Sequence, residues 1–120
     1  MTTKELLGLD YRDEDNKYTL LRAAKQIPPL HDMLDNAIEI EHIEKVIHVM
    51  CKKYEMFIHI QQDPVSGGKY DIWSAQVFST TTLKELQKVY GISLTELFLK
   101  LSIAIYSDVR KIKKGDRAKR

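Results

Sequence analysis

The sequence predicts an α+β protein in which a two-stranded antiparallel hairpin packs against amphipathic helices. The chain has 120 residues, 43% of them hydrophobic, which suits one domain with its own core. Only the stretch from Met56 to Phe78 has the aromatic and β-branched composition of sheet. Elsewhere the apolar residues recur at helical spacing, so the expected order is helix, hairpin, helix, helix.

The N-terminal region is expected to be helical. Thr2 and Glu5 have the spacing of a capping box and predict a short helix over residues 4–9. A second helical run follows the acidic cluster at 13–16 and ends before the two prolines at 28–29, which cannot continue a helix.

The segment from Ile40 to Tyr54 predicts a helix with one buried side. Its opposite side carries acidic residues, lysines and histidines, as expected of a face in water. The apolar stripe consists of Ile40, Ile43, Ile47, Met50, Cys51 and Tyr54.

The hairpin is expected to pair residues 56–62 with residues 70–78 through a glycine-containing loop. Apolar residues occur on both faces of each strand, so both faces should be partly covered. Because an isolated pair of strands is marginal in water and has two open edges, a second copy of the chain could extend it.

Two helices are expected after the hairpin. Thr82 and Glu85 form a second capping box, which predicts a helix over Leu83–Tyr90 closed by Gly91. A third capping box starts at Ser93 and predicts a last helix that runs to about residue 111.

The last helix has two apolar stripes about 150° apart, and a single neighbour cannot cover both. The main stripe contains Leu94, Leu97, Phe98, Leu101, Ile105 and Val109. The second contains Leu99, Ile103 and Tyr106. We therefore expect a homo-oligomer whose protein interface includes Leu99, Ile103 and Tyr106.

Charge is distributed unevenly along the chain. Residues 1–109 carry 12 Lys and Arg against 16 Asp and Glu, whereas residues 110–120 carry 7 against 1. We expect a domain over residues 1–112 and a basic, disordered tail over 113–120. The tail region offers an alternative, nucleic-acid-binding set: Arg110, Lys111, Lys113, Lys114, Arg117, Lys119 and Arg120.

Residues 82–97, with Leu101, resemble the helix-turn-helix of bacterial DNA-binding proteins. The resemblance implies a DNA-binding regulator in which apolar residues hold two helices at a steep angle. Here those residues would be Leu86, Tyr90, Ile92, Leu97 and Leu101. The sequence departs from the pattern at Gln87, and Leu94, Thr95, Phe98 and Leu99 on the reading face cannot read bases.

A second resemblance is to small phage and mobile-element proteins built as helix, hairpin, helix. A strand carrying Trp73 and Ala75 runs into a threonine-capped segment at residues 80–83. This resemblance implies an accessory protein that acts by binding.

No residue pattern indicates catalysis. His42 and His48 lie about 240° apart on their helix and cannot share a metal ion, and Cys51 belongs to an apolar stripe. The glycine loop at 66–69 leads into a strand, not into the helix of a phosphate-binding loop. We expect no enzyme activity, no cofactor and no metal.

The sequence thus predicts a small cytoplasmic interaction or regulatory protein that self-associates, with a nucleic-acid-binding regulator as the alternative. One cysteine cannot form an internal disulfide, and no secretory signal pattern is present. The longest strongly apolar run, 97–106, is too short to cross a membrane.

Overall fold

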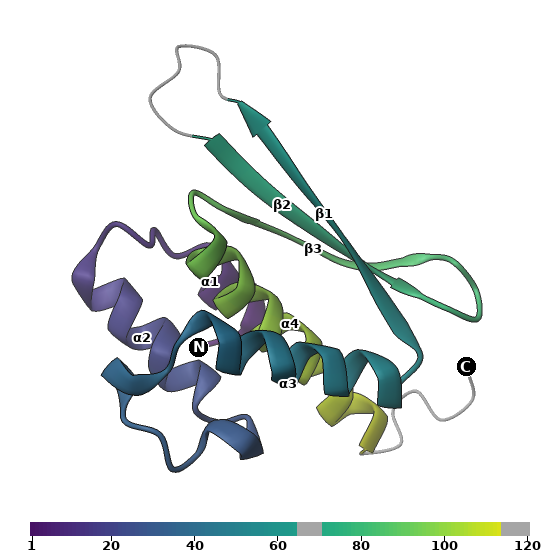
Figure 1. Cartoon of the computed structure of the whole chain (residues 1–120), viewed down its shortest axis with the longest axis horizontal. Coiled ribbons are helices and arrows are strands. Elements are labelled where there is room, and N and C mark those ends of the chain that lie inside the picture. The colour runs from purple at the N-terminus through teal and green to yellow at the C-terminus, as the bar shows by residue number, and fades with distance from the viewer. Residues whose placement is uncertain (65–70, 114–120) are drawn as a thin grey trace.

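A computed structural model describes residues 1–64 and 71–113 and confirms the α+β class (Figure 1). A sheet forms one layer and the helices form the other. The helices are α1 (Thr3–Leu7), α2 (Glu14–Ala24), α3 (Ile40–Lys53) and α4 (Leu94–Lys113), with short 3-10 turns η1 (Pro28–Leu30) and η2 (Asp35–Ala37). The strands are β1 (Met56–Pro64), β2 (Asp71–Ser79) and β3 (Glu85–Gly91).

The sheet has three antiparallel strands in the order β1-β2-β3, so the expectation of two strands was incomplete. β1 and β2 pair from Met56 opposite Ser79 without a register shift. Side chains of one face, including Val77 and Val89, are buried under the helices. On the other face Phe57 and Phe78 stack with their ring centroids 5.1 Å apart.

The predicted helix over Leu83–Tyr90 is wrong, because these residues lead into and form β3. Lys88 and Tyr90 are exposed while Val89 is buried, which is the two-residue period of a strand. β3 pairs with β2 between Trp73, which lies opposite Gly91, and Phe78, which lies opposite Glu85. Without a first helix, the helix-turn-helix expectation for residues 82–101 is also wrong.

The turn before β3 explains why the capping box at Thr82 and Glu85 does not start a helix. The Ser79 hydroxyl accepts hydrogen bonds from the backbone amides of Thr81 and Thr82 at 3.2 Å. Leu83 then has a φ of 61°, in the left-handed region that a right-handed helix excludes. The chain therefore reverses at Leu83 and enters a strand.

The capping boxes predicted at Thr2 and Ser93 do start helices. The Thr2 hydroxyl accepts from the Glu5 amide and the Ser93 hydroxyl from the Glu96 amide, both at 3.2 Å. The Asp13 carboxylate caps α2. α2 ends at Ala24, three residues before Ile27, which is the last residue ahead of the two prolines.

α4 is the centre of the fold and contacts α1, α2, α3, β2 and β3. Leu97, Leu101 and Ile105 of its main stripe are fully buried. The buried stripe of α3, with Ile43, Ile47, Met50 and Cys51, belongs to the same core. None of the described helices is both long enough and apolar enough to cross a membrane.

Candidate interaction surfaces

The residues predicted as a protein interface lie mainly inside the molecule. Leu99 is 1% exposed and Ile103 is 6% exposed, whereas Tyr106 is half-buried. The chain itself supplies cover for both stripes of α4, because α1 and α2 lie on the side that the sheet and α3 leave open. The argument that α4 requires a second copy therefore does not hold, and an interface role would involve Tyr106 more readily than Leu99.

The predicted nucleic-acid set is only partly described. Arg110 and Lys111 are exposed near the end of α4, and Lys113 is its last residue. The remaining members, Lys114, Arg117, Lys119 and Arg120, lie outside the described residues.

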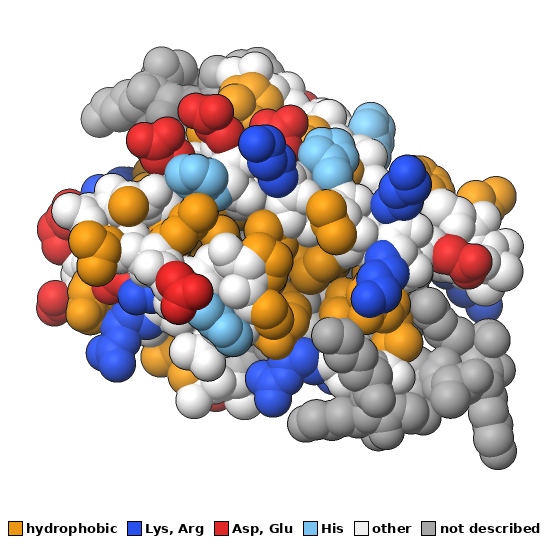
Figure 2. Space-filling view, turned by 60° about the horizontal axis from the view of Figure 1, so that its bottom comes forward, with side chains coloured by type: hydrophobic (Ala, Val, Ile, Leu, Met, Phe, Trp, Pro, Cys, Tyr) orange, Lys and Arg blue, Asp and Glu red, His pale blue; other side chains and the backbone are white. Residues whose placement is uncertain are grey.

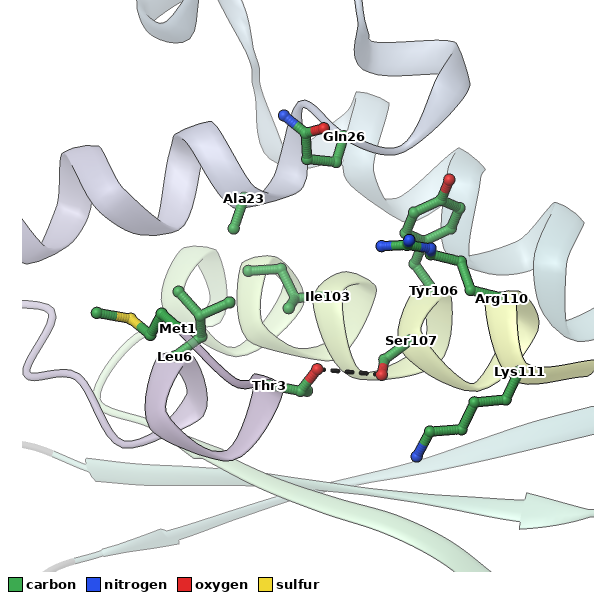
Figure 3. Close-up of a pocket in the computed structure, with 10 residues that line it drawn as sticks. All are labelled: Met1, Thr3, Leu6, Ala23, Gln26, Ile103, Tyr106, Ser107, Arg110 and Lys111. Atoms are coloured by element: carbon green, nitrogen blue, oxygen red, sulfur yellow. Dashed lines mark hydrogen bonds between the residues drawn. The ribbon is translucent and has the colours of Figure 1, made fainter. Parts of the chain in front are cut away.

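Members of both predicted sets meet at one cavity, the α1–α2–α4 cavity, which has a volume of about 500 Å³. Figure 3 shows Ile103, Tyr106, Ser107, Arg110 and Lys111 of α4 along it, with Arg110 beside Tyr106 and Lys111 on the side of Ser107. The Thr3 hydroxyl donates to the Ser107 hydroxyl at 3.0 Å and ties α1 to α4 at its wall. The cavity thus combines an apolar wall with two cations at one end.

A second hollow, the α3–α4 groove, lies on the other side of Tyr106 and has a volume of about 320 Å³. Figure 2 shows hydrophobic side chains on the helical side of the molecule, with basic, histidine and acidic side chains beside them. The groove is lined by Ile27, Pro28, Pro29, Val46, Val49, Met50, Tyr54, Tyr106 and Val109, with Lys45 and Lys53. Tyr106 is common to both hollows, so they are neighbours on the surface.

The third surface is the free edge of β1. Among the strands that the structure describes, β2 is its only neighbour in the sheet. Among the described residues, no backbone hydrogen bond joins Phe57–Gln61 to a segment other than β2. The side chains of Ile58 and Ile60 are half-buried although they point to the helical side. Backbone and side chains at this edge are therefore open to another chain.

The histidines and the cysteine do not form a reactive cluster. No group of three metal-ligating side chains occurs within the described ranges. His42 accepts from the Glu39 amide at 3.2 Å, and His48 lies 3.6 Å from Glu44 on the surface. Burial raises the pKa of the Cys51 thiol to about 11, which disfavours the nucleophilic thiolate.

A buried ion pair between two α4 residues was not predicted from the sequence. Lys100 Nζ lies 3.2 Å from Glu96 Oε1, and the two side chains are each 6% exposed. Lys100 also donates to the Leu9 carbonyl at 2.8 Å, which anchors the segment before α2. The spacing of four residues was the available signal, but Glu96 fitted a capping role and Lys100 interrupted an apolar run.

Comparison with protein-family models, curated proteins and solved structures yields no match for this chain. The cavity, the groove and the β1 edge are thus the grounds for a functional proposal.

Proposed function

We propose that this is a small non-enzymatic interaction protein that works as a two-fold dimer joined through the free edges of β1. The observation that carries the proposal is the open, unprotected edge of this strand. A strand at the edge of a sheet presents unpaired N–H and C=O groups and is a ready template for pairing with another chain.

Proteins that keep their edge strands apart usually place lysine, proline or a bulge there. β1 has none of these from Met56 to Asp63, its one proline is its last residue, Pro64, and its pairing with β2 is regular. The opposite edge differs, because β3 carries Glu85 and Lys88 and its pairing with β2 shifts register at Val77/Phe78. Only β1 is therefore suited to accept another strand.

The hydrogen-bond pattern identifies which residues of β1 face outward. The Thr80 amide donates to the Glu55 carbonyl at 3.0 Å, and partners alternate along an antiparallel strand. Odd-numbered residues of β1 thus direct their backbone groups toward β2. Ile58 and Ile60 direct theirs to the free edge.

This edge is self-complementary. A two-fold axis through His59 sets Ile58 opposite Ile60 of the partner subunit, and the reverse pair follows by symmetry. The half-buried isoleucine side chains then cover one another on the helical side, while backbone groups of both residues pair across the axis. The result is a six-stranded sheet across two subunits.

The test is the molar mass in solution of the protein and of an Ile60→Lys variant, measured by light scattering. We expect the unchanged protein to have twice the 14.0 kDa of one chain, and the variant to have the mass of one chain. A lysine at an edge position opposes strand pairing.

Ile72→Lys is the matched control. Ile72 is 37% exposed and lies on the central strand β2, so this variant should keep the mass of the dimer. A monomeric unchanged protein, or an equal loss of mass in both variants, would contradict pairing through β1.

A further inference from the structure

We infer that the α1–α2–α4 cavity and the α3–α4 groove together form a second binding site, for an acidic amphipathic segment of another protein. The site lies on the helical side of the molecule, away from the free edge of β1, so it goes beyond the proposed dimer. Tyr106 lines both hollows, so they are neighbours on this side of the molecule.

The charged side chains that line this surface have one sign. Among the described residues, the lining of the two hollows includes Lys45, Lys53, Arg110 and Lys111 but no aspartate or glutamate. Within the described part of the chain, none of these four cations forms an ion pair. By contrast, residues 1–109 as a whole carry 12 Lys and Arg against 16 Asp and Glu. This surface is thus a cationic region on an acidic body, which suits an anionic partner.

The apolar part of the site follows helical spacing. Val46, Val49 and Met50 lie on one side of α3 and face Tyr106 and Val109 of α4 across the groove. Val49 is 64% exposed, so its side chain is available to a ligand. A partner helix binds such a groove through apolar residues on one face. The lysines at positions 45 and 53 would then pair with carboxylates of the partner helix that flank its apolar face.

The groove favours a protein segment over a nucleic acid. Single-stranded nucleic acids bind through aromatic platforms for their bases and cations for their phosphates. Here aliphatic side chains and the two prolines at 28–29 make up most of the groove, and a sugar-phosphate backbone would leave them in water. Leucine-type side chains would cover them.

The probe is a fluorescent amphipathic helical peptide with leucines along one face and glutamates elsewhere. We expect it to bind the full chain, as measured by fluorescence anisotropy, and a peptide with serine for each leucine to bind at least about tenfold more weakly. A single-stranded DNA of equal charge should also bind more weakly. Equal binding by the serine peptide or by the DNA, or no binding by the leucine peptide, would overturn the inference.

Two pairs of variants locate the binding. Lys53→Glu should weaken binding of the leucine peptide several-fold. Lys52→Glu, on the same turn but outside the groove, should leave binding unchanged. Val49→Asp should weaken it, whereas Leu34→Asp, at a residue 71% exposed and outside both hollows, should not. Equal effects within either pair would mean that the peptide does not occupy the groove. Loss of the dimer in Ile60→Lys should leave peptide binding intact, which separates this site from the β1 edge.

Discussion

Gly91 ends β3 at a point where the strand passes directly over the first turn of α4. A Cβ atom added there would lie 2.8 Å from the Leu97 amide nitrogen and 3.2 Å from the Ser93 carbonyl oxygen. From the sequence, Gly91 was expected to close a helix, but in the structure this glycine allows a close approach between two backbones. The strand and the helix it leads into can pack together only because residue 91 has no side chain.

We predict that Gly91→Ala destabilises the protein by about 1–3 kcal/mol, because backbone atoms of α4 must shift to admit a methyl group. The measurement is the free energy of unfolding in urea. Gly8→Ala is the control, since its Cβ would meet nothing closer than 3.6 Å. A similar loss in both variants would show that the contact with α4 is not the cause.

Cys51 gives a second prediction at this scale. Burial raises its pKa from an ordinary value of 9.0 to about 11, so the thiolate fraction at pH 8 should be roughly 100-fold below that of a free cysteine. We expect iodoacetamide to react slowly with the folded protein and rapidly in urea. Between pH 9 and 11 the folded protein keeps the thiol proton and the unfolded chain loses it. The free energy of unfolding should therefore fall as pH rises through that window. Fast labelling of the folded protein would contradict the assigned burial.

Among the elements, β3 and the turn before it were the least accessible to sequence analysis. Thr82 and Glu85 have the spacing of a helix start, and Glu85, Leu86 and Lys88 are compatible with a helix. Tertiary contacts make this segment a strand. The open side of β2 offers hydrogen-bond partners for its backbone, and the Ser79 side chain stabilises the turn that reverses the chain. By contrast, α3 could be predicted accurately, because its apolar stripe is long and regular.

The left-handed backbone at Leu83 leads to a prediction about the β2–β3 turn. A non-glycine residue pays about 1 kcal/mol in this conformation, and Leu83 is 69% exposed, so its side chain contributes little packing. Leu83→Gly should therefore be neutral or should stabilise the protein by up to about 1 kcal/mol in urea unfolding. A clear loss of stability would mean that the leucine side chain has an unrecognised contact.

The buried pair of α4 gives a further prediction. Lys100→Met leaves the Glu96 carboxylate buried without its cation, which should cost about 3–5 kcal/mol. Glu96→Gln/Lys100→Met removes both charges and should cost less than Lys100→Met alone. Urea unfolding of the two variants checks this. Both variants lose the Lys100 bond to Leu9, so they differ only at residue 96. A greater loss in the double variant would contradict the expected cost of an unpaired Glu96 carboxylate.

For the whole molecule, composition and periodicity were enough to predict the α+β class and the position of the hairpin. They could not show that α4 is central, because its two stripes have the same appearance whether α1 and α2 or a second copy covers them. The same limit applies to the binding site around Tyr106. Its residues come from α1, α2, η1, α3 and α4, and only the fold brings them together.

The measurement that tests the account most directly is amide hydrogen exchange in β1 at several protein concentrations. The Phe57 and His59 amides face β2 and should be protected at every concentration. The Ile58 and Ile60 amides face the free edge, and the account predicts that they are protected at high concentration and lose protection on dilution, as the dimer separates. Rapid exchange of these two amides at all concentrations would contradict it.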